Sequence, residues 1–181
     1  LKEQRCVTLD QIARGVGDID IDVDLLSDLR SFAAIDHTGS HIACETQDSK
    51  YRIRRLTDYA VTHTLTDPER GKDDDFSMPD WCHFSSDGRY FLAETYRGKN
   101  RVLLLWPLDA PDKPILLGST KLVKDDIFER YAAAFSPDGS QLAVAALDSA
   151  VVKVYDLRVK TPFVRHEIPL PKVRHVAWHP N

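Results

Sequence analysis

The stretch that decides the fold reads YAAAFSPDGSQLAVAALDSAVVKVYDLR and covers residues 131–158. An apolar run is followed by a turn signal, a second apolar run, a second turn signal and an alternating run. Short segments rich in Val, Ile, Tyr and Phe between turn residues are typical of β-strands. No window of the chain shows a convincing 3.6-residue apolar period with capping residues, so the sequence favours strands over helices.

The same order of features occurs three times when the chain is aligned on one glycine. The three glycines are Gly39, Gly88 and Gly139, spaced 49 and 51 residues apart. Each glycine closes a turn that reads DHTG, SSDG or SPDG. In such turns Asp and Ser bond the local backbone, and Gly supplies a positive φ without a Cβ clash. We therefore assign a structural turn role to the three glycines and to Asp87 and Asp138.

Each copy has room for four short strands. The second strands read HIACE, YFLAE and QLAVA, and the third strands read YRIRRL, RVLLLW and VVKVYDL. The fourth strands are expected at YAVTHTL (59–65), PILLGST (114–120) and FVRHEI (163–168). Four antiparallel strands in a repeat of about 40 to 50 residues are the sequence mark of a β-propeller blade. The predicted fold class is all-β, a β-propeller of four-stranded antiparallel blades.

The chain is predicted to hold about three complete blades and partial blades at both ends, in one domain over residues 1–181. The segment DIDIDVDLL (18–26) is expected to be a fourth strand of a preceding blade, and VRHVAWHPN (173–181) a first strand of a following one. The predicted blade boundaries are 1–26 (partial), 29–66, 81–120, 130–168 and 173–181 (partial). A closed ring takes about four to eight blades, so we expect further blades from a longer chain or from a partner chain.

The sequence FSPDGSQLAV…VVKVYDL resembles a degenerate WD-repeat blade, with Tyr155 and Asp156 in the Trp-Asp position. In the preceding copy Trp106 is followed by Pro107, and the first copy has neither residue. The Gly-His dipeptide of the family, expected about ten residues before the first strand, is missing from every copy. The family's hydrogen-bond tetrad of Asp, His, Ser/Thr and Trp is therefore not carried over. The resemblance covers about residues 29–181 and implies a scaffold for protein–protein interaction.

Composition limits the classes of partner. The chain is 43% hydrophobic and 29% charged, as in a folded globular domain. Its formal net charge of −4 supplies no global basic field to hold nucleic acid or an anionic membrane. The cysteines Cys6, Cys44 and Cys82 are far apart and form no CxxC, which favours reduced thiols in a cytoplasmic compartment.

No catalytic or metal motif is recognised, so we expect no enzyme activity, cofactor or metal. The sequence lacks a GxSxG elbow, a P-loop, a GxGxxG fingerprint and an HExxH motif. In DIDIDVD (18–24) the carboxylates alternate with apolar residues, and we interpret them as the solvated face of an outer strand rather than a calcium site. His175 and His179 would lie about 13 Å apart on a strand, too far for one ion.

Two long connections predict a partner-docking face. They are PERGKDDDFSMPD (68–80) and KLVKDDIFER (121–130), each between the fourth strand of one blade and the first of the next. Such connections run over the same face as the turns between second and third strands, and long loops on rigid scaffolds often carry function. A solvated loop without a partner is the other interpretation of 68–80. The candidate residues of the face are Lys50, Arg70, Lys72, Asp73, Asp74, Asp75, Phe76, Met78, Arg97, Lys99, Asn100 and Lys124.

The favoured function is a non-enzymatic WD-repeat-type scaffold that binds a protein or peptide through this face. The alternative is part of an enzymatic or enzyme-gating propeller, such as a metal-dependent lactonase or a peptidase-associated propeller. Such enzymes place acidic and His ligands on the inner first strands. Here those strands are mostly apolar or small, with only His83 and His175 near them.

Overall fold

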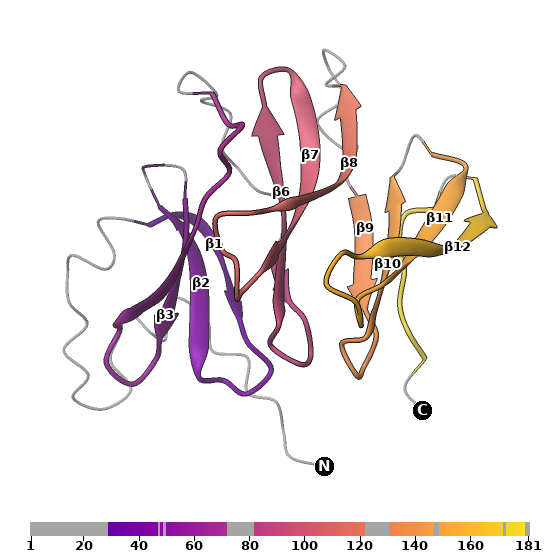
Figure 1. The fold of residues 1–181 in the computed structure, drawn as a ribbon. Coiled ribbons are helices and arrows are strands. Elements are labelled where there is room, and N and C mark those ends of the chain that lie inside the picture. Colours follow the sequence, from indigo (N-terminus) through magenta and orange to yellow (C-terminus); the bar gives the residue numbers. More distant parts are fainter. Residues whose placement is uncertain are drawn as a thin grey trace.

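The fold is seen in a computed structural model that describes residues 29–46, 48, 50–71, 82–121, 131–146, 149–171 and 173–179. These residues contain twelve β-strands and no helix, arranged as three four-stranded antiparallel sheets (Figure 1). In each sheet the strands neighbour one another in chain order, as in a β-meander. The prediction of an all-β chain of four-stranded antiparallel blades is confirmed.

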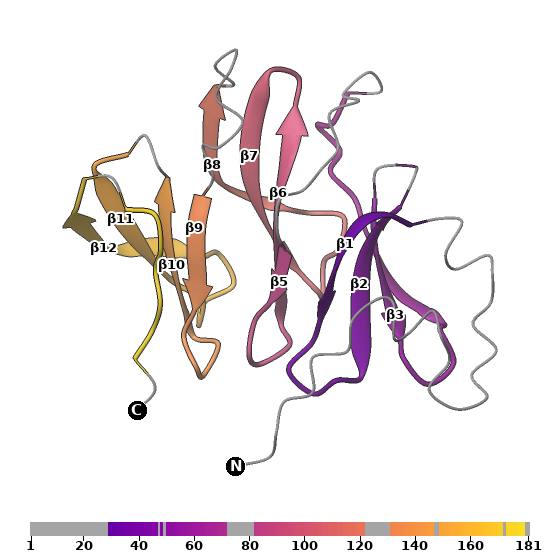
Figure 2. The same cartoon turned by 180° about the vertical axis from the view of Figure 1, so that it is seen from behind.

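We call the three sheets blades 1, 2 and 3. Blade 1 consists of β1 (Leu29–Ile35), β2 (His41–Thr46), β3 (Tyr51–Arg55) and β4 (Val61–Leu65). Blade 2 consists of β5 (Cys82–Phe84), β6 (Tyr90–Arg97), β7 (Asn100–Pro107) and β8 (Ile115–Lys121). Blade 3 consists of β9 (Tyr131–Phe135), β10 (Gln141–Ala146), β11 (Val151–Asp156) and β12 (Phe163–Pro169). The three blades stand side by side, with blade 2 in the middle (Figures 1 and 2).

The partial blades expected at the two ends of the chain stay predictions. The segment DIDIDVDLL and Cys6 lie outside the described residues. Residues 173–179 form no strand, but the Trp178 indole Nε1 donates to the Ala134 carbonyl at 2.8 Å. This bond anchors the segment beside β9, the first strand of blade 3.

Blade 2 is buried on both faces because its side chains alternate between the two neighbouring blades. Phe91 and Trp106 join a cluster with blade 1, whereas Leu92 and Leu105 join a cluster with blade 3. Successive residues of a strand point to opposite faces, so a run such as VLLLW serves both interfaces at once. All the apolar residues from Val102 to Trp106 are at most 2% exposed.

The interface between blades 1 and 2 is aromatic. The Tyr51 ring lies 5.2 Å from Phe91 and 5.6 Å from Trp106, measured between centroids, and both pairs are tilted or edge-on. Such geometries are preferred because the positive ring edge meets the negative ring face. The polar ends of two of these rings are also satisfied: the Tyr51 hydroxyl donates to the Glu94 carbonyl at 3.3 Å, and Trp106 Nε1 donates to the Thr66 carbonyl at 3.0 Å.

The three glycine turns have the geometry that the sequence predicts. Gly39, Gly88 and Gly139 all have φ of 70°, in the left-handed region that favours glycine. Each glycine N–H donates to the carbonyl three residues earlier, at 2.9 to 3.0 Å. A Cβ on Gly39 or Gly88 would meet no atom within 4 Å, but one on Gly139 would lie 2.4 Å from Cγ of Asp87. The turn of blade 3 is thus fitted against the turn of blade 2.

This contact predicts different costs for two matched substitutions. Gly88→Ala should lower the free energy of unfolding by about 1–2 kcal/mol, the cost of a left-handed alanine. Gly139→Ala should cost about 1–3 kcal/mol more, because the new methyl group overpacks against Asp87. The measurement is urea denaturation of both variants. In an Asp87→Ala background the two substitutions should cost the same, and an unchanged difference there would contradict the contact.

Candidate functional site

The blades have two ends, which carry different candidate sites. We call the end that carries the β2–β3 and β6–β7 turns and residues 66–71 the loop-bearing face. We call the opposite end, with the β1–β2, β5–β6 and β9–β10 turns, the turn face. In Figure 1 the β6–β7 turn lies at the top of blade 2 and the β5–β6 turn at the bottom. The turns after β3, β7 and β11 also lie at the turn face, since Leu108 N–H bonds the Arg89 carbonyl and Leu157 N–H bonds the Ser140 carbonyl.

On the loop-bearing face Arg97 fastens the start of the β4–β5 connection to blade 2. Its Nε and Nη2 donate to the two carboxylate oxygens of Asp67 at 2.8 and 2.7 Å, and its Nη1 donates to Glu69 at 2.5 Å. The Asp67 side chain is 4% exposed and that of Arg97 is 14% exposed. A paired fork of this kind fixes both direction and distance. The connection therefore leaves blade 1 along a path that blade 2 determines.

A second pair of this face joins Arg70 to Glu45. Arg70 Nη1 lies 3.4 Å from Glu45 Oε1, and both side chains are almost fully buried. Glu94 occupies the same position of the next repeat, six residues after the turn glycine, and its Oε1 lies 2.9 Å from Arg101 Nε. The two buried carboxylates thus find guanidinium groups from different parts of the repeat. The third repeat has Ala145 in their place.

The predicted docking residues therefore divide into three groups. Arg70 and Arg97 form ion pairs within the chain. Lys99 and Asn100 are exposed, and Lys50 is partly exposed with its Nζ 3.0 Å from Asp48 Oδ2. The remaining candidates lie outside the described residues: Lys72, Asp73, Asp74, Asp75, Phe76, Met78 and Lys124. A docking role for this face stays a prediction.

On the turn face two of the three glycine turns use a serine–aspartate relay. Ser136 Oγ accepts the Gln141 N–H at 2.9 Å and donates to Asp138 Oδ1 at 2.6 Å. Asp138 in turn accepts the Ser140 N–H at 3.0 Å. In blade 2 Ser85 and Asp87 make the matching bonds. The roles predicted for Asp87 and Asp138 thus have a local hydrogen-bond basis.

In blade 1 a single carboxylate performs both tasks. Asp36 takes the position of the serine, and its Oδ1 accepts the N–H groups of Ser40 and His41 at 2.8 and 2.9 Å. Its Oδ2 accepts the Thr38 hydroxyl at 2.7 Å. Burial alone would raise the pKa of Asp36, but the hydrogen bonds from His41, Thr38 and Ser40 lower that pKa to about 2.

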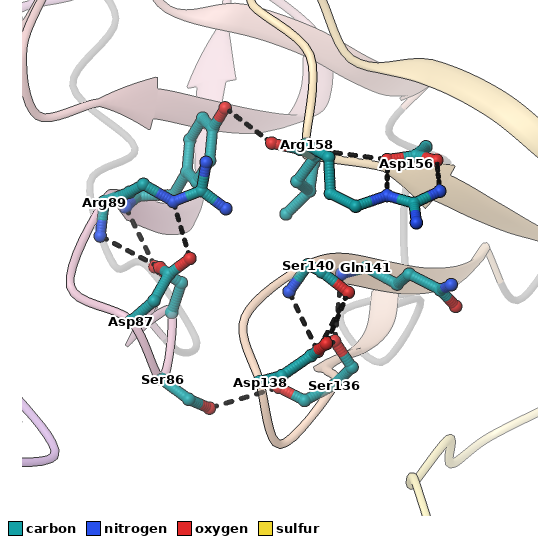
Figure 3. Close-up of polar contacts among 12 residues, drawn as sticks. Ser86, Asp87, Arg89, Ser136, Asp138, Ser140, Gln141, Asp156 and Arg158 are labelled. Atoms are coloured by element: carbon teal, nitrogen blue, oxygen red, sulfur yellow. Dashed lines mark hydrogen bonds and ion pairs between the residues drawn. The ribbon is translucent and has the colours of Figure 1, made fainter.

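The turns of blades 2 and 3 also form one polar network (Figure 3). Ser86 Oγ donates to the Ser136 carbonyl at 3.2 Å across the interface. Asp87 Oδ2 accepts Arg89 Nε at 2.6 Å, and Asp156 Oδ1 accepts Arg158 Nε at 2.9 Å. Arg89 and Arg158 therefore stand on neighbouring blades, each beside its own carboxylate, as Figure 3 shows.

A groove of about 990 Å³ opens at this end. It is lined by the β5–β6 turn, the β7–β8 connection and the segment after β11, with His63 of β4 at one side. Its basic residues are Arg89, Lys113, Arg158 and Lys160, and its acidic lining residue is Asp109. The sequence analysis missed this groove. The signal was present, because Lys113 and Lys160 lie in matching Pro-containing turns, APDKP and RVKTP, of two neighbouring repeats.

The described cysteines are buried and not in disulfides. Burial raises the pKa of the Cys44 thiol to about 11 and that of the Cys82 thiol to about 12. Among the residues that the structure describes, no three His, Cys, Asp or Glu side chains gather as a metal site would require. The described residues also include no helix of the length and hydropathy needed to cross a membrane.

Comparisons with known proteins identify the architecture. No family model and no curated protein matches the chain. Among solved structures, the Dos1 propeller matches 74% of the chain at 19% identity with a TM-score of 0.50. The Cps50 (Swd1) β-propeller domain of Myceliophteria thermophila matches 80% at 10% identity with a TM-score of 0.51. The fold is that of a WD-repeat-like β-propeller.

The chain spans between about a third and a half of the length of these two propeller structures. It covers 32% of the Dos1 structure and 47% of the Cps50 structure. Its departures from the family pattern, Tyr155-Asp156 for Trp-Asp and Trp106-Pro107 in the preceding repeat, do not prevent blade formation. In place of Trp, Tyr155 donates its hydroxyl to the Leu117 carbonyl of blade 2 at 3.0 Å.

The loop-bearing face predicts a stability difference between two nearby residues. Arg97→Met should lower the free energy of unfolding by about 2 kcal/mol or more, because it leaves the nearly buried Asp67 carboxylate without its partner. Lys99→Met, two residues away on the exposed turn, should change it by less than about 0.5 kcal/mol. Chemical denaturation of both variants measures the difference, and equal values would show that Arg97 has no fastening role.

The turn carboxylates predict a dependence on pH. The folded-state pKa of Asp36 is about 2, below its ordinary value of 3.8, so Asp36 stabilises the fold above about pH 4. That contribution is lost as pH falls through about 2. The difference in unfolding free energy between the chain and its Asp36→Asn variant should therefore shrink between about pH 4 and pH 2. The exposed Asp112→Asn serves as the control, and a pH-independent difference for Asp36→Asn would contradict the hydrogen-bond account.

Proposed function

We propose that the chain is a non-enzymatic scaffold that binds a protein or peptide partner through its loop-bearing face. The WD-repeat-like fold supports a role in protein interaction in general terms, and the finer assignment depends on the face itself. Its β2–β3 and β6–β7 turns present Lys50, Lys99 and Asn100 at the surface, while a long connection starts beside them.

The fastening of residues 66–71 by two arginines is the observation that carries this proposal. Arg97 holds Asp67 and Glu69, and Arg70 holds Glu45, so the beginning of the connection is tied to blade 1 and to blade 2. A loop whose base is ordered before binding loses less conformational entropy when a partner arrives. Complexes with such ordered surfaces also form with little backbone movement. The blades therefore act as a rigid base for a docking surface.

Site-specific photo-crosslinking in the native cells tests the proposal. A photoreactive residue at Lys50 or Lys99 should give discrete adducts with another polypeptide. The control is Glu167, which is exposed on strand β12 of blade 3 and lies outside the turns and connection that define this face. Absence of adducts at Lys50 and Lys99, or the same adducts at Glu167, would refute docking through the loop-bearing face.

A further inference from the structure

The groove on the turn face combines fixed positive charge with an apolar lining. Arg89 and Arg158 are half exposed, with 49% and 56% of their side chains accessible. Asp87 accepts a hydrogen bond from Nε of Arg89, and Asp156 accepts hydrogen bonds from Nε and Nη2 of Arg158. Among the described residues, both terminal nitrogens of Arg89 and Nη1 of Arg158 donate to no other side chain. Their donors are thus oriented in advance and remain open to a ligand.

Lys113 and Lys160 add positive charge to the groove that no described carboxylate pairs with. Neither lysine forms an ion pair with any residue that the structure describes, whereas both arginines do. Asp109 supplies the one acidic side chain among the described residues of the groove lining. Because Asp87 and Asp156 pair with the two arginines, the excess positive charge of the groove comes from the two lysines, although the whole chain has a net charge of −4. Such a local contrast attracts and orients an acidic ligand.

The apolar side chains favour a peptide over a simple anion. Leu108 and Ile115 line the groove and are half-buried, and Val159 is 43% exposed. An exposed valine next to cations suits a segment in which an apolar side chain stands among carboxylates. Burial of one such side chain contributes hydrophobic free energy that a phosphate ion could not supply.

The aromatic side chain of the groove argues against nucleic acid. Tyr90 is 6% exposed, the Arg89 guanidinium covers its ring at 5.5 Å, and its hydroxyl donates to the Leu157 carbonyl at 3.3 Å. Single-stranded nucleic acids bind proteins by stacking bases on open aromatic faces, and Tyr90 offers none.

We propose that this groove binds an extended acidic segment of a partner protein. Carboxylates of the segment face Lys113 and Lys160 and accept the open donors of Arg89 and Arg158, and an apolar side chain contacts Val159. This site lies at the opposite end of the blades from the loop-bearing face. The inference shares with the proposed function only the role of the blades as a binding platform.

Fluorescence anisotropy with a defined probe tests the proposal. The probe is a labelled ten-residue peptide of alternating Asp and Glu around a central Leu, and the control peptide has Asn and Gln in place of the acids. The acidic peptide should bind at least about tenfold more tightly than the control. Lys113→Glu combined with Lys160→Glu should weaken binding about tenfold or more, whereas Lys50→Glu with Lys99→Glu should change it less than about twofold. Circular dichroism confirms that both double variants stay folded.

Three results would overturn the proposal. They are equal binding of the two peptides, equal weakening by the two double variants, and tighter binding of a single-stranded RNA of the same charge. The second result would indicate attraction by general charge, and the third a nucleic-acid site. The two proposals can fail separately. If photo-crosslinking gives no adducts at Lys50 and Lys99 but the acidic peptide still binds the groove, only the proposed function is refuted. If adducts form but the acidic peptide does not bind, only the groove proposal is refuted.

Discussion

Strands β6 and β7 bury side chains on both of their faces, and the arrangement of the other strands depends on this. A sheet that is apolar on two sides must be covered on two sides, so blade 2 is stable only between two neighbours. Polar atoms within these interfaces need partners that do not interrupt the packing. Three tyrosines meet this need in the same way: Tyr51, Tyr90 and Tyr155 each donate a hydroxyl to a backbone carbonyl of the neighbouring blade. The interfaces are thereby apolar in area and specific in register.

The same packing makes both ends of the blades rigid. At the loop-bearing face, the Arg70–Glu45 and Arg97–Asp67 pairs are largely shielded from water and tie the start of the β4–β5 connection to blades 1 and 2. At the turn face, Gly139 touches Asp87 and Ser86 bonds the Ser136 carbonyl, so adjacent turns are in direct contact. Rigid ends lower the entropic cost of binding, which is why a platform of this kind can present different surfaces on one core.

The features that the sequence predicts are those with local causes. A glycine turn depends on its own few residues, so Gly39, Gly88 and Gly139 could be assigned together with Asp87 and Asp138, and the strands on either side followed from them. The role of Asp36 in the first turn was not assigned. The roles of Arg70 and Arg97 could not be predicted in this way. Their carboxylate partners lie 25 to 30 residues away and meet them only after the blades have packed. From the sequence, both arginines were interpreted as surface charges. In the structure, both form ion pairs that hold the β4–β5 connection. The groove was missed for the same reason, because its basic residues come from two blades.

The two ends of the blades differ in how many arginine donors remain available to a ligand. On the loop-bearing face, the Arg97 guanidinium uses all three of its nitrogens on Asp67 and Glu69, so it has little left to offer. On the turn face, Arg89 is held through Nε alone, and its carboxylate partner restricts its motion without occupying its terminal donors. A carboxylate that binds one edge of a guanidinium partly neutralises the charge of the arginine. It also fixes the rotamer of the arginine, so less side-chain entropy is lost when a ligand binds the remaining donors. Lys113 and Lys160, which form no ion pair with any described residue, then add longer-range attraction for an anion. Arginines that are held by carboxylates, together with these two lysines, are the combination on which the proposed binding of an acidic segment depends.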